Sequence, residues 1–271
     1  MQTSRLVVLL SWFASTSVLF GENTVRAVLD YHSGIGFTQS YTNSSSVIGV
    51  SSRVTEGPFG GPVDPFNGPY LPTQLLSIGA GGFVTLQLDE PFHDHPENPF
   101  GMDFSVFGNS FFVITNGDYA GGGITDGSVY PSTPGVSRVS VSGDGITFFE
   151  LTPSLAPSLV TYYPTDGSGR FDQVANPNLT AVDFAGKDIS GIRSLYAGSA
   201  GGTGFDLGWA RNSSGESVYV GAVSFVRIDV LAGHVEIDGI TAVPEPTTVS
   251  LLALFGLVAF AGSRKAQSPR I

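Results

Sequence analysis

The sequence predicts an all-β fold, an antiparallel β-sandwich or jelly roll. Helical spacing of apolar residues is not sustained anywhere, whereas short runs of Val, Ile, Phe and Thr recur between clusters of Gly, Pro, Asn and Asp. The chain holds 36 Gly and 17 Pro, which divide it into many short segments joined by turns. Many short strands with frequent turns are typical of two packed antiparallel sheets.

The first segment, residues 1–27, predicts a secretory signal peptide. Arg5 precedes a nearly uncharged run from Leu6 to Phe20, which has the length of a signal-peptide core and is short for a membrane span. Val25 and Ala27 form the pair of small residues that a signal peptidase favours. We therefore expect export and cleavage after Ala27, with cleavage after Gly21 as the alternative and an uncleaved anchor as the competing interpretation.

Residues 28–240 are expected to form one β-sandwich domain outside the cytoplasm. This segment is long enough to bury a substantial core, and because the chain has no Cys it uses neither disulfides nor a thiol nucleophile. The chain carries 23 Asp and Glu against 12 Lys and Arg, a net charge of -11. This acidic balance excludes a basic footprint for nucleic acid and suits a solvated extracellular surface.

The clearest local unit in this domain is the sequence SRVSVSGDGITFFEL, which predicts a β-hairpin. Val139 and Val141 alternate with polar residues, Asp144–Gly145 supplies a turn, and apolar residues resume at Ile146. We expect at least eight strands in two sheets, with long loops at residues 57–72 and 116–128 where ligands bind. The residues expected in or beside the core are Val139, Val141, Phe148, Phe225, Val226 and Ile228.

Asp206 is the one candidate metal ligand that a motif indicates. The sequence GGTGFDLGW, residues 201–209, matches the first six positions of a calcium-binding nonapeptide repeat. A single copy has no neighbouring repeat to stack on, and Gly208 stands where that repeat needs a large apolar residue. We therefore expect a tight turn leading into a strand, with Asp206 capping the loop, and keep a calcium ligand as the alternative, since calcium needs several oxygens at once.

Two other patterns carry weaker chemical interpretations. His93 and His95 flank Asp94, and on a strand both imidazoles would share one face and chelate a transition metal, but Pro91 and Pro96 favour an exposed loop. The sequence AGSAG, residues 197–201, resembles a nucleophile elbow, which needs a strand-to-helix turn that the pattern does not predict. Paired carboxylates for glycoside hydrolysis stay open, because spacing along the chain does not give their separation.

The C-terminal segments carry the most specific motif. Residues 241–248 hold Pro244, Glu245 and Pro246, residues 249–263 are an uncharged hydrophobic helix, and residues 264–271 form a basic tail with Arg264 and Lys265. This arrangement resembles the PEP-CTERM sorting signal of Gram-negative bacteria, which implies processing by exosortase. The resemblance assigns the tripeptide to recognition, the helix to membrane insertion and the two basic residues to the cytoplasmic side. An ordinary C-terminal anchor is the competing interpretation.

The body resembles, more loosely, a group of cell-surface proteins that precede the same signal. The shared stretches are GGFVTLQLDEPF, NPFGMDFSVFGNSFF, VSRVSVSGDGITFFEL, AGGTGFDLGWA and VSFVRIDV followed by EIDGI. The order of the last strands is also similar to galactose-binding, discoidin-type jelly rolls, although the Cys pair of many such domains is missing here. This second resemblance implies a β-sandwich and transfers no sugar-binding residue.

Taken together, the sequence predicts an exported protein of the cell envelope, outer surface or extracellular matrix, anchored in the inner membrane until processing. Its expected partners are signal peptidase, exosortase and exopolysaccharide or other glycans, and calcium is the one ion that we consider. We expect a structural or carbohydrate-associated role and no catalysis; the alternative is a secreted glycoside hydrolase or lyase on a β-sandwich. A binding module would expose aromatics such as Tyr130, Tyr163 or Trp209 along a groove, and a glycosidase would place two carboxylates in a cleft.

Overall fold

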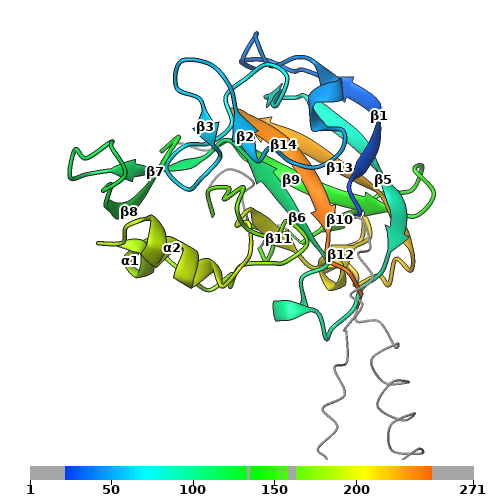
Figure 1. Ribbon diagram of the computed structural model, residues 1–271. Helices are drawn as coiled ribbons and strands as arrows, with labels where there is room; N and C mark the ends of the chain where they lie inside the picture. The colour runs from blue at the N-terminus through cyan, green and yellow to red at the C-terminus, as the bar shows by residue number, and fades with distance from the viewer. Residues whose placement is uncertain (1–21, 133–134, 153, 158–162, 246–271) are drawn as a thin grey trace, which may run out of the picture.

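Two antiparallel sheets packed face to face form the body of the protein, in agreement with the predicted β-sandwich (Figure 1). The computed structural model describes residues 22–132, 135–152, 154–157 and 163–245. The predicted signal-peptide core, the hydrophobic helix and the basic tail lie outside these residues. Among the described residues, no helix is both long enough and apolar enough to cross a bilayer.

The larger sheet has six strands in the order β1-β5-β13-β9-β10-β12, and every neighbouring pair is antiparallel. The predicted hairpin is present as β9 and β10, with Phe149 opposite Val141. Its strands are β1 Val25–His32, β5 Phe83–Phe92, β13 Val223–Ala232, β9 Val136–Ser142, β10 Phe149–Leu151 and β12 Ala210–Arg211.

The second sheet has four strands in the order β11-β6-β14-β4, and two short ribbons, β2-β3 and β7-β8, complete the strands of the described residues. The four strands are β11 Thr203–Phe205, β6 Phe104–Gly108, β14 His234–Ala242 and β4 Leu76–Gly79. The ribbons are β2 Val54–Thr55 with β3 Gly61–Pro62, and β7 Phe111–Ile114 with β8 Thr125–Tyr130.

Alternation along the central strands explains why the sheets pack. On β13, Val226, Ile228 and Val230 are buried, and they alternate with the partly exposed Arg227 and Asp229. Because side chains point to opposite faces at every second position, each strand gives its apolar row to the core and its polar row to the outer face. The core joins rows from both sheets, including Leu86 on β5, Val141 on β9, Phe104 on β6 and Ile237 on β14. It is the dominant stabilising feature of a chain without disulfides.

Four of the residues expected in the core are positioned as predicted, and the two Phe are less buried. Val139, Val141, Val226 and Ile228 are at most 3% exposed, and Phe225 flanks the turn through its ring, which lies close to Gly145. Phe148 is partly exposed, and the neighbouring Ile146 is 85% exposed. The reason is that the hairpin turn extends over residues 143–148 before β10 begins, so this apolar run does not enter the sheet immediately.

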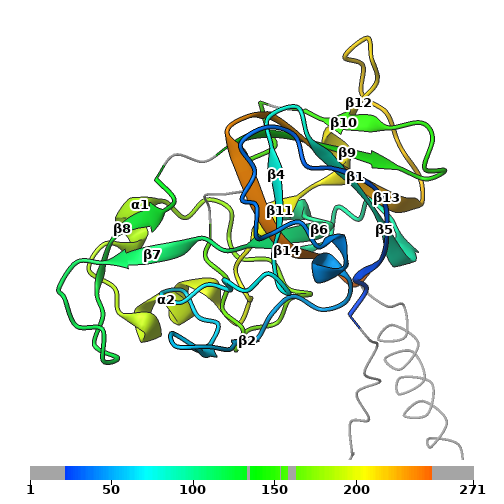
Figure 2. The same ribbon diagram turned by 90° about the horizontal axis from the view of Figure 1, so that it is seen from above.

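Two short helices form a second layer beside the sandwich, and the sequence pattern did not indicate them. The helices are α1 Ala181–Phe184 and α2 Ile189–Tyr196, and both lie next to the β7-β8 ribbon at one side of the molecule (Figures 1 and 2). Asp188 caps α2 by accepting a hydrogen bond from the Gly191 backbone N–H over 2.8 Å. Phe112, Phe184 and Tyr196 form a separate apolar cluster under these helices.

Single-turn 3-10 helices occur at three places in the described chain. They are η1 Ser44–Val47, η2 Pro99–Gly101 and η3 Leu207–Trp209. The last two belong to the loops beside β6 and β11, and they shape the carboxylate cluster described below.

Both ends of the described body lie side by side. Thr24 pairs with Thr241, and the backbone N–H of Ala242 donates to the carbonyl of Asn23 over 2.9 Å. Asn23 and Thr24 thus belong to the body, although they lie within the segment 1–27 predicted as signal peptide, and β14 ends two residues after the predicted boundary of 240. Val25 opens β1 and is 1% exposed in the core.

Burial of Val25 bears on the N-terminal cleavage point. Cleavage after Ala27 would remove a core side chain and the first three residues of β1, whereas cleavage after Gly21 leaves the strand whole. We therefore expect the exported protein to begin at Glu22. N-terminal sequencing of the mature protein distinguishes the two sites, and a chain that begins at Val28 would contradict this expectation.

The difference between Phe104 and Phe148 gives a direct test of the core. Phe104 is fully buried and stacks on Phe205 with ring centroids 5.2 Å apart, so Phe104→Ala is expected to cost about 3–5 kcal/mol of unfolding free energy. Phe148→Ala removes the same atoms from a partly exposed site and should cost clearly less. Urea unfolding of the two variants measures both values; equal losses would show that burial in the sandwich does not set the cost.

A buried carboxylate in β14 makes the stability depend on pH. Asp238 is the extra residue of an irregularity in the β14-β6 pairing, is 3% exposed, and accepts hydrogen bonds from the Ser52 backbone N–H and hydroxyl over 2.6 and 2.8 Å. Burial raises the pKa of Asp238 to about 7, and the two Ser52 bonds offset only part of that rise.

Because the folded pKa of Asp238 lies above the unfolded one, its contribution to stability is full below about pH 4 and is lost as the pH rises through about 7. Asp238→Asn cannot lose a proton, so the stability of the wild type should fall relative to this variant between pH 4 and 8. Denaturant unfolding of freshly prepared protein at each pH measures the difference. A difference that does not change with pH would contradict the buried titration.

Candidate functional site

The sorting segment leaves the body directly after β14. Val243 is 6% exposed and packs with Met102 and Val174, and its N–H donates to the Asp103 carbonyl over 2.8 Å. Pro244 and Glu245 follow and are exposed. Pro246, Arg264 and Lys265 lie outside the described residues, so the structure places two of the five predicted sorting residues.

Glu245 is held against the body by one contact. Its Oε1 lies 2.6 Å from His93 Nδ1, and both side chains are 46% exposed. His93, Asp94 and His95 are in a loop after β5, as the flanking prolines predicted, and not on a strand. The described residues therefore do not arrange the two imidazoles as a pair of metal ligands on one strand face.

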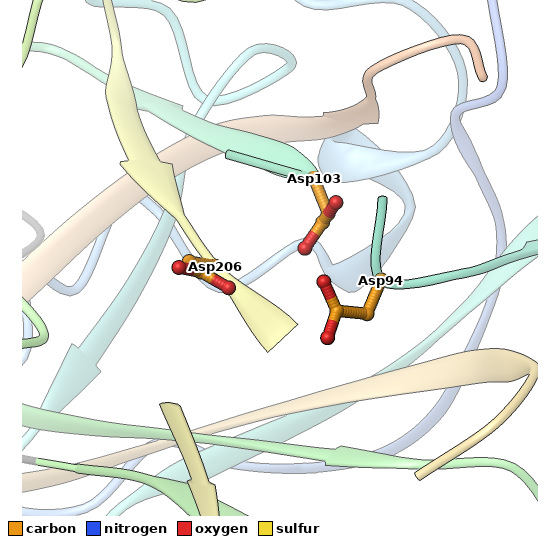
Figure 3. Close-up of side chains that lie close together, drawn as sticks. All are labelled: Asp94, Asp103 and Asp206. Carbon is orange, nitrogen blue, oxygen red and sulfur yellow. The ribbon is translucent and has the colours of Figure 1, made fainter. Parts of the chain in front are cut away.

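Three carboxylates converge beside this loop. Asp94, Asp103 and Asp206 each offer one oxygen, and these oxygens all lie within 4.8 Å of one another (Figure 3). Asp94 and Asp103 lie in the loop between β5 and β6, and Asp206 follows β11, so two segments far apart in the sequence meet at this point. We call these three residues the carboxylate cluster. The sequence pattern selected only Asp206, because the other two join it through the sheet topology and not through a motif.

Asp206 also caps the turn, as the sequence predicted. Its Oδ1 accepts from the Gly208 N–H over 2.6 Å at the start of η3, and Gly201 and Gly202 adopt positive φ in the turn before β11. Gly208 is needed there, since a Cβ would lie 2.9 Å from Asp206 Oδ1. Asp206 thus both caps a turn and faces two further carboxylates.

Asp103 is the most buried member of the cluster, with 0% exposure. Its Oδ1 accepts from the His95 N–H over 3.1 Å and from Asn98 Nδ2 over 2.9 Å, and its Oδ2 accepts from the Leu207 N–H over 2.8 Å. Burial raises the pKa of Asp103 to about 6, and the neighbouring Asp94 carboxylate adds to that rise. Burial also raises the pKa of Asp206, again with a contribution from Asp94.

A wide groove lined by aromatic residues lies at the other end of β14. Its volume is about 600 Å³, and it runs between the loops at 38–41 and 66–70, the start of β7 and the end of β8. Tyr130 is 59% exposed and stacks on Phe111 with ring centroids 5.2 Å apart. We call this hollow the aromatic groove; its other aromatic walls are Tyr41, Phe66 and Tyr70.

Glu236 is the acidic group of the aromatic groove. Its two carboxylate oxygens accept hydrogen bonds from the Thr38 hydroxyl and from Asn109 Nδ2, and its side chain is 11% exposed. His234 Nε2 lies 3.9 Å from Oε1. Among the described residues that line the groove, Glu236 is the one carboxylate. The sequence did not single out Glu236, because polar and apolar residues alternate around it as they do in any half-buried strand.

The other expected aromatics do not line this groove. Tyr163 is 5% exposed, and its hydroxyl donates to the carbonyls of Asn176 and Leu179 over 2.7 and 3.0 Å. Trp209 is partly exposed and packs against the main core. Of the three, Tyr130 is the exposed wall of the aromatic groove, whereas Tyr163 and Trp209 both line a separate pocket of about 370 Å³.

Residues 242–265 match the family model of the PEP-CTERM protein-sorting motif. The chain is an exosortase-sorted surface protein. The matched range begins at the last residue of β14 and includes all five predicted sorting residues. A comparison with curated proteins finds no match. The motif implies export and processing by exosortase, and it leaves the activity of the body open.

The nucleophile-elbow interpretation of residues 197–201 does not fit the local geometry. Ala197 follows helix α2 with φ 52°, so the order of elements is helix then turn, the reverse of a strand-to-helix elbow. Ser199 is 2% exposed, and its hydroxyl donates to the Gln173 carbonyl over 2.6 Å and accepts from the Gly201 N–H over 3.0 Å. This hydroxyl stabilises the turn.

Two substitutions test whether Glu245 is recognised by exosortase or only contacts His93 of the body. Glu245→Ala should leave membrane insertion intact and block removal of the tail, so the protein accumulates in the membrane fraction, heavier by the mass of the tail. His93→Ala removes the contact with Glu245 and keeps the motif, so its tail should still be removed. Mass spectrometry of the membrane and extracellular fractions from a host with exosortase measures both. Normal processing of Glu245→Ala would show that this glutamate is only part of a linker.

Proposed function

We propose that the body of this surface protein binds carbohydrate of the cell envelope or exopolymer matrix in the aromatic groove. The observation that carries the proposal is the exposed Tyr130–Phe111 stack next to the hydrogen-bonded Glu236. A sugar ring has apolar C–H faces and a rim of hydroxyl groups, so it needs flat aromatic surface together with a few fixed polar groups. The groove offers both, and its volume of about 600 Å³ suits an oligosaccharide of a few units.

The polar groups of the groove are already oriented. Thr38 and Asn109 donate to Glu236, which fixes the carboxylate without neutralising it by a Lys or Arg ion pair within the described part of the chain. The Tyr41 hydroxyl donates to the Tyr70 carbonyl over 2.7 Å, and burial raises the pKa of Tyr41, with Glu236 adding to the rise. Because the Tyr41 hydroxyl and the Glu236 carboxylate are already held in place, they can bind sugar hydroxyls with little further loss of side-chain freedom.

Binding is favoured over hydrolysis by the composition of the groove. Glycosidases use two carboxyl groups about 5–10 Å apart, one as acid and one as base or nucleophile. The described lining of the groove supplies Glu236 alone, and both its oxygens accept hydrogen bonds from neutral donors. A glycoside hydrolase acting in this groove would need a second carboxylate, which the described lining of the groove does not supply.

The test is a glycan array followed by calorimetry on the strongest oligosaccharide. Tyr130→Ala removes an exposed ring from the groove and should weaken binding about tenfold or more, the loss of roughly 1.4 kcal/mol of aromatic contact. The matched control is Tyr219→Ala, because Tyr219 is 75% exposed and does not line the groove. This control should leave binding unchanged.

Two outcomes would contradict the proposal. One is an array without any bound glycan, and the other is an equal loss for Tyr130→Ala and Tyr219→Ala, which would indicate nonspecific adhesion. An assay of reducing-end release with the same oligosaccharide separates binding from catalysis. Turnover that Glu236→Gln abolishes would establish the enzyme alternative in place of the binding role.

A further inference from the structure

The carboxylate cluster concentrates negative charge without a compensating base. No Lys or Arg of the described chain forms an ion pair with Asp94, Asp103 or Asp206, although their oxygens approach within 4.8 Å of one another. Like charges this close are unfavourable, and more so when one of them is fully buried as Asp103 is.

A second, independent observation is an orphaned oxygen next to the cluster. Asn98 is 4% exposed, and its Oδ1 is buried without any hydrogen-bond partner, whereas its Nδ2 donates to Asp103 Oδ1. The free oxygen therefore belongs to an amide that is fixed on the cluster. Buried amide oxygens in folded proteins nearly always have a hydrogen-bond donor, an ordered water or an ion beside them. The orphaned atom therefore leaves a position for a ligand beside the cluster.

We propose that Asp94, Asp103, Asp206 and the Asn98 side-chain oxygen bind a calcium ion. Two oxygens that share a calcium ion at about 2.4 Å lie no more than about 4.8 Å apart, and the oxygens of the three carboxylates lie within 4.8 Å of one another. The donors are all oxygens, and carboxylates with an amide carbonyl are the usual ligands of hard cations. Asp94 and Asp206 are partly exposed, so water can supply the remaining positions of a calcium shell.

Calcium fits this site better than magnesium for a structural reason. Magnesium needs a near-ideal octahedron, keeps most of its water and rarely uses several protein carboxylates from separate loops, whereas calcium accepts irregular shells of 6–8 oxygens. Asp94, Asn98 and Asp103 lie in the β5-β6 loop and Asp206 follows β11, so the site offers four protein oxygens from two segments. The bound ion would fasten this loop to β11 and η3. This inference does not depend on carbohydrate binding in the aromatic groove.

The experiment uses the full-length chain, purified in detergent and treated with a chelator. Terbium is the probe, because Trp209 lies three residues after Asp206 and the other Trp of the chain, Trp12, lies in the predicted signal peptide. Excitation of Trp209 should give terbium luminescence that calcium abolishes and magnesium at the same concentration does not. Calcium should also raise the melting temperature of the wild type.

The variant is Asp94→Ala, and the matched control is Asp30→Ala. The Asp94 side chain accepts no hydrogen bond from the rest of the described chain, so its loss should weaken calcium binding at least tenfold without unfolding the apo protein. Asp30 is an exposed carboxylate on β1, away from the cluster, and its loss should change nothing. Asn98→Ala should also weaken binding, with circular dichroism as the check that it folds.

Three results would overturn the proposal. They are the absence of terbium luminescence and of a calcium-dependent melting temperature in the wild type, an equal effect of Asp94→Ala and Asp30→Ala, and displacement of terbium by zinc at lower concentrations than by calcium. Zinc preference would assign the site to a transition metal that uses the buried Nδ1 of His95, which is also without a hydrogen-bond partner.

Discussion

The apolar contact between the two sheets is the interaction on which the rest of the structure depends. The chain has no disulfide, and its larger sheet is held in register by cross-strand rows such as Leu86, Val226 and Val141. These rows fix β13 between β5 and β9, and they set the direction in which each outer-face residue points. Both candidate sites lie on loops and strand ends, as is common when a rigid scaffold carries variable loops.

Much of the scaffold could be predicted from the sequence, because period-two alternation is a local signal. The alternation of β13 and the β9-β10 hairpin are both visible in the printed sequence, and both are present. Helix α2 was missed, since eight residues are too few for helical spacing to stand out and its stability comes from Asp188 and from packing. We predicted more burial for Phe148 than the structure shows. The sequence did not reveal that the hairpin turn extends to residue 148, so that β10 begins only at the next residue.

The candidate sites were harder to predict than the fold, and the reason is distance along the chain. Asp94, Asp103 and Asp206 meet because β6 pairs with β11, a contact that no spacing reveals. Tyr130 was identified by residue type alone, and the same reasoning selected Tyr163, which is buried. Only the sorting motif could be identified completely from the sequence, because it consists of contiguous residues and does not depend on tertiary contacts.

Strand β14 connects the aromatic groove with the sorting segment. Glu236 near its beginning belongs to the aromatic groove, and the sorting segment starts at Val243, seven residues further along an extended backbone, roughly 20–25 Å away. On the proposal that the groove binds glycan, this separation lets the ligand be held at one end of the strand while the tail is removed beyond the other end. A glycan bound to the precursor would then be released together with the processed protein.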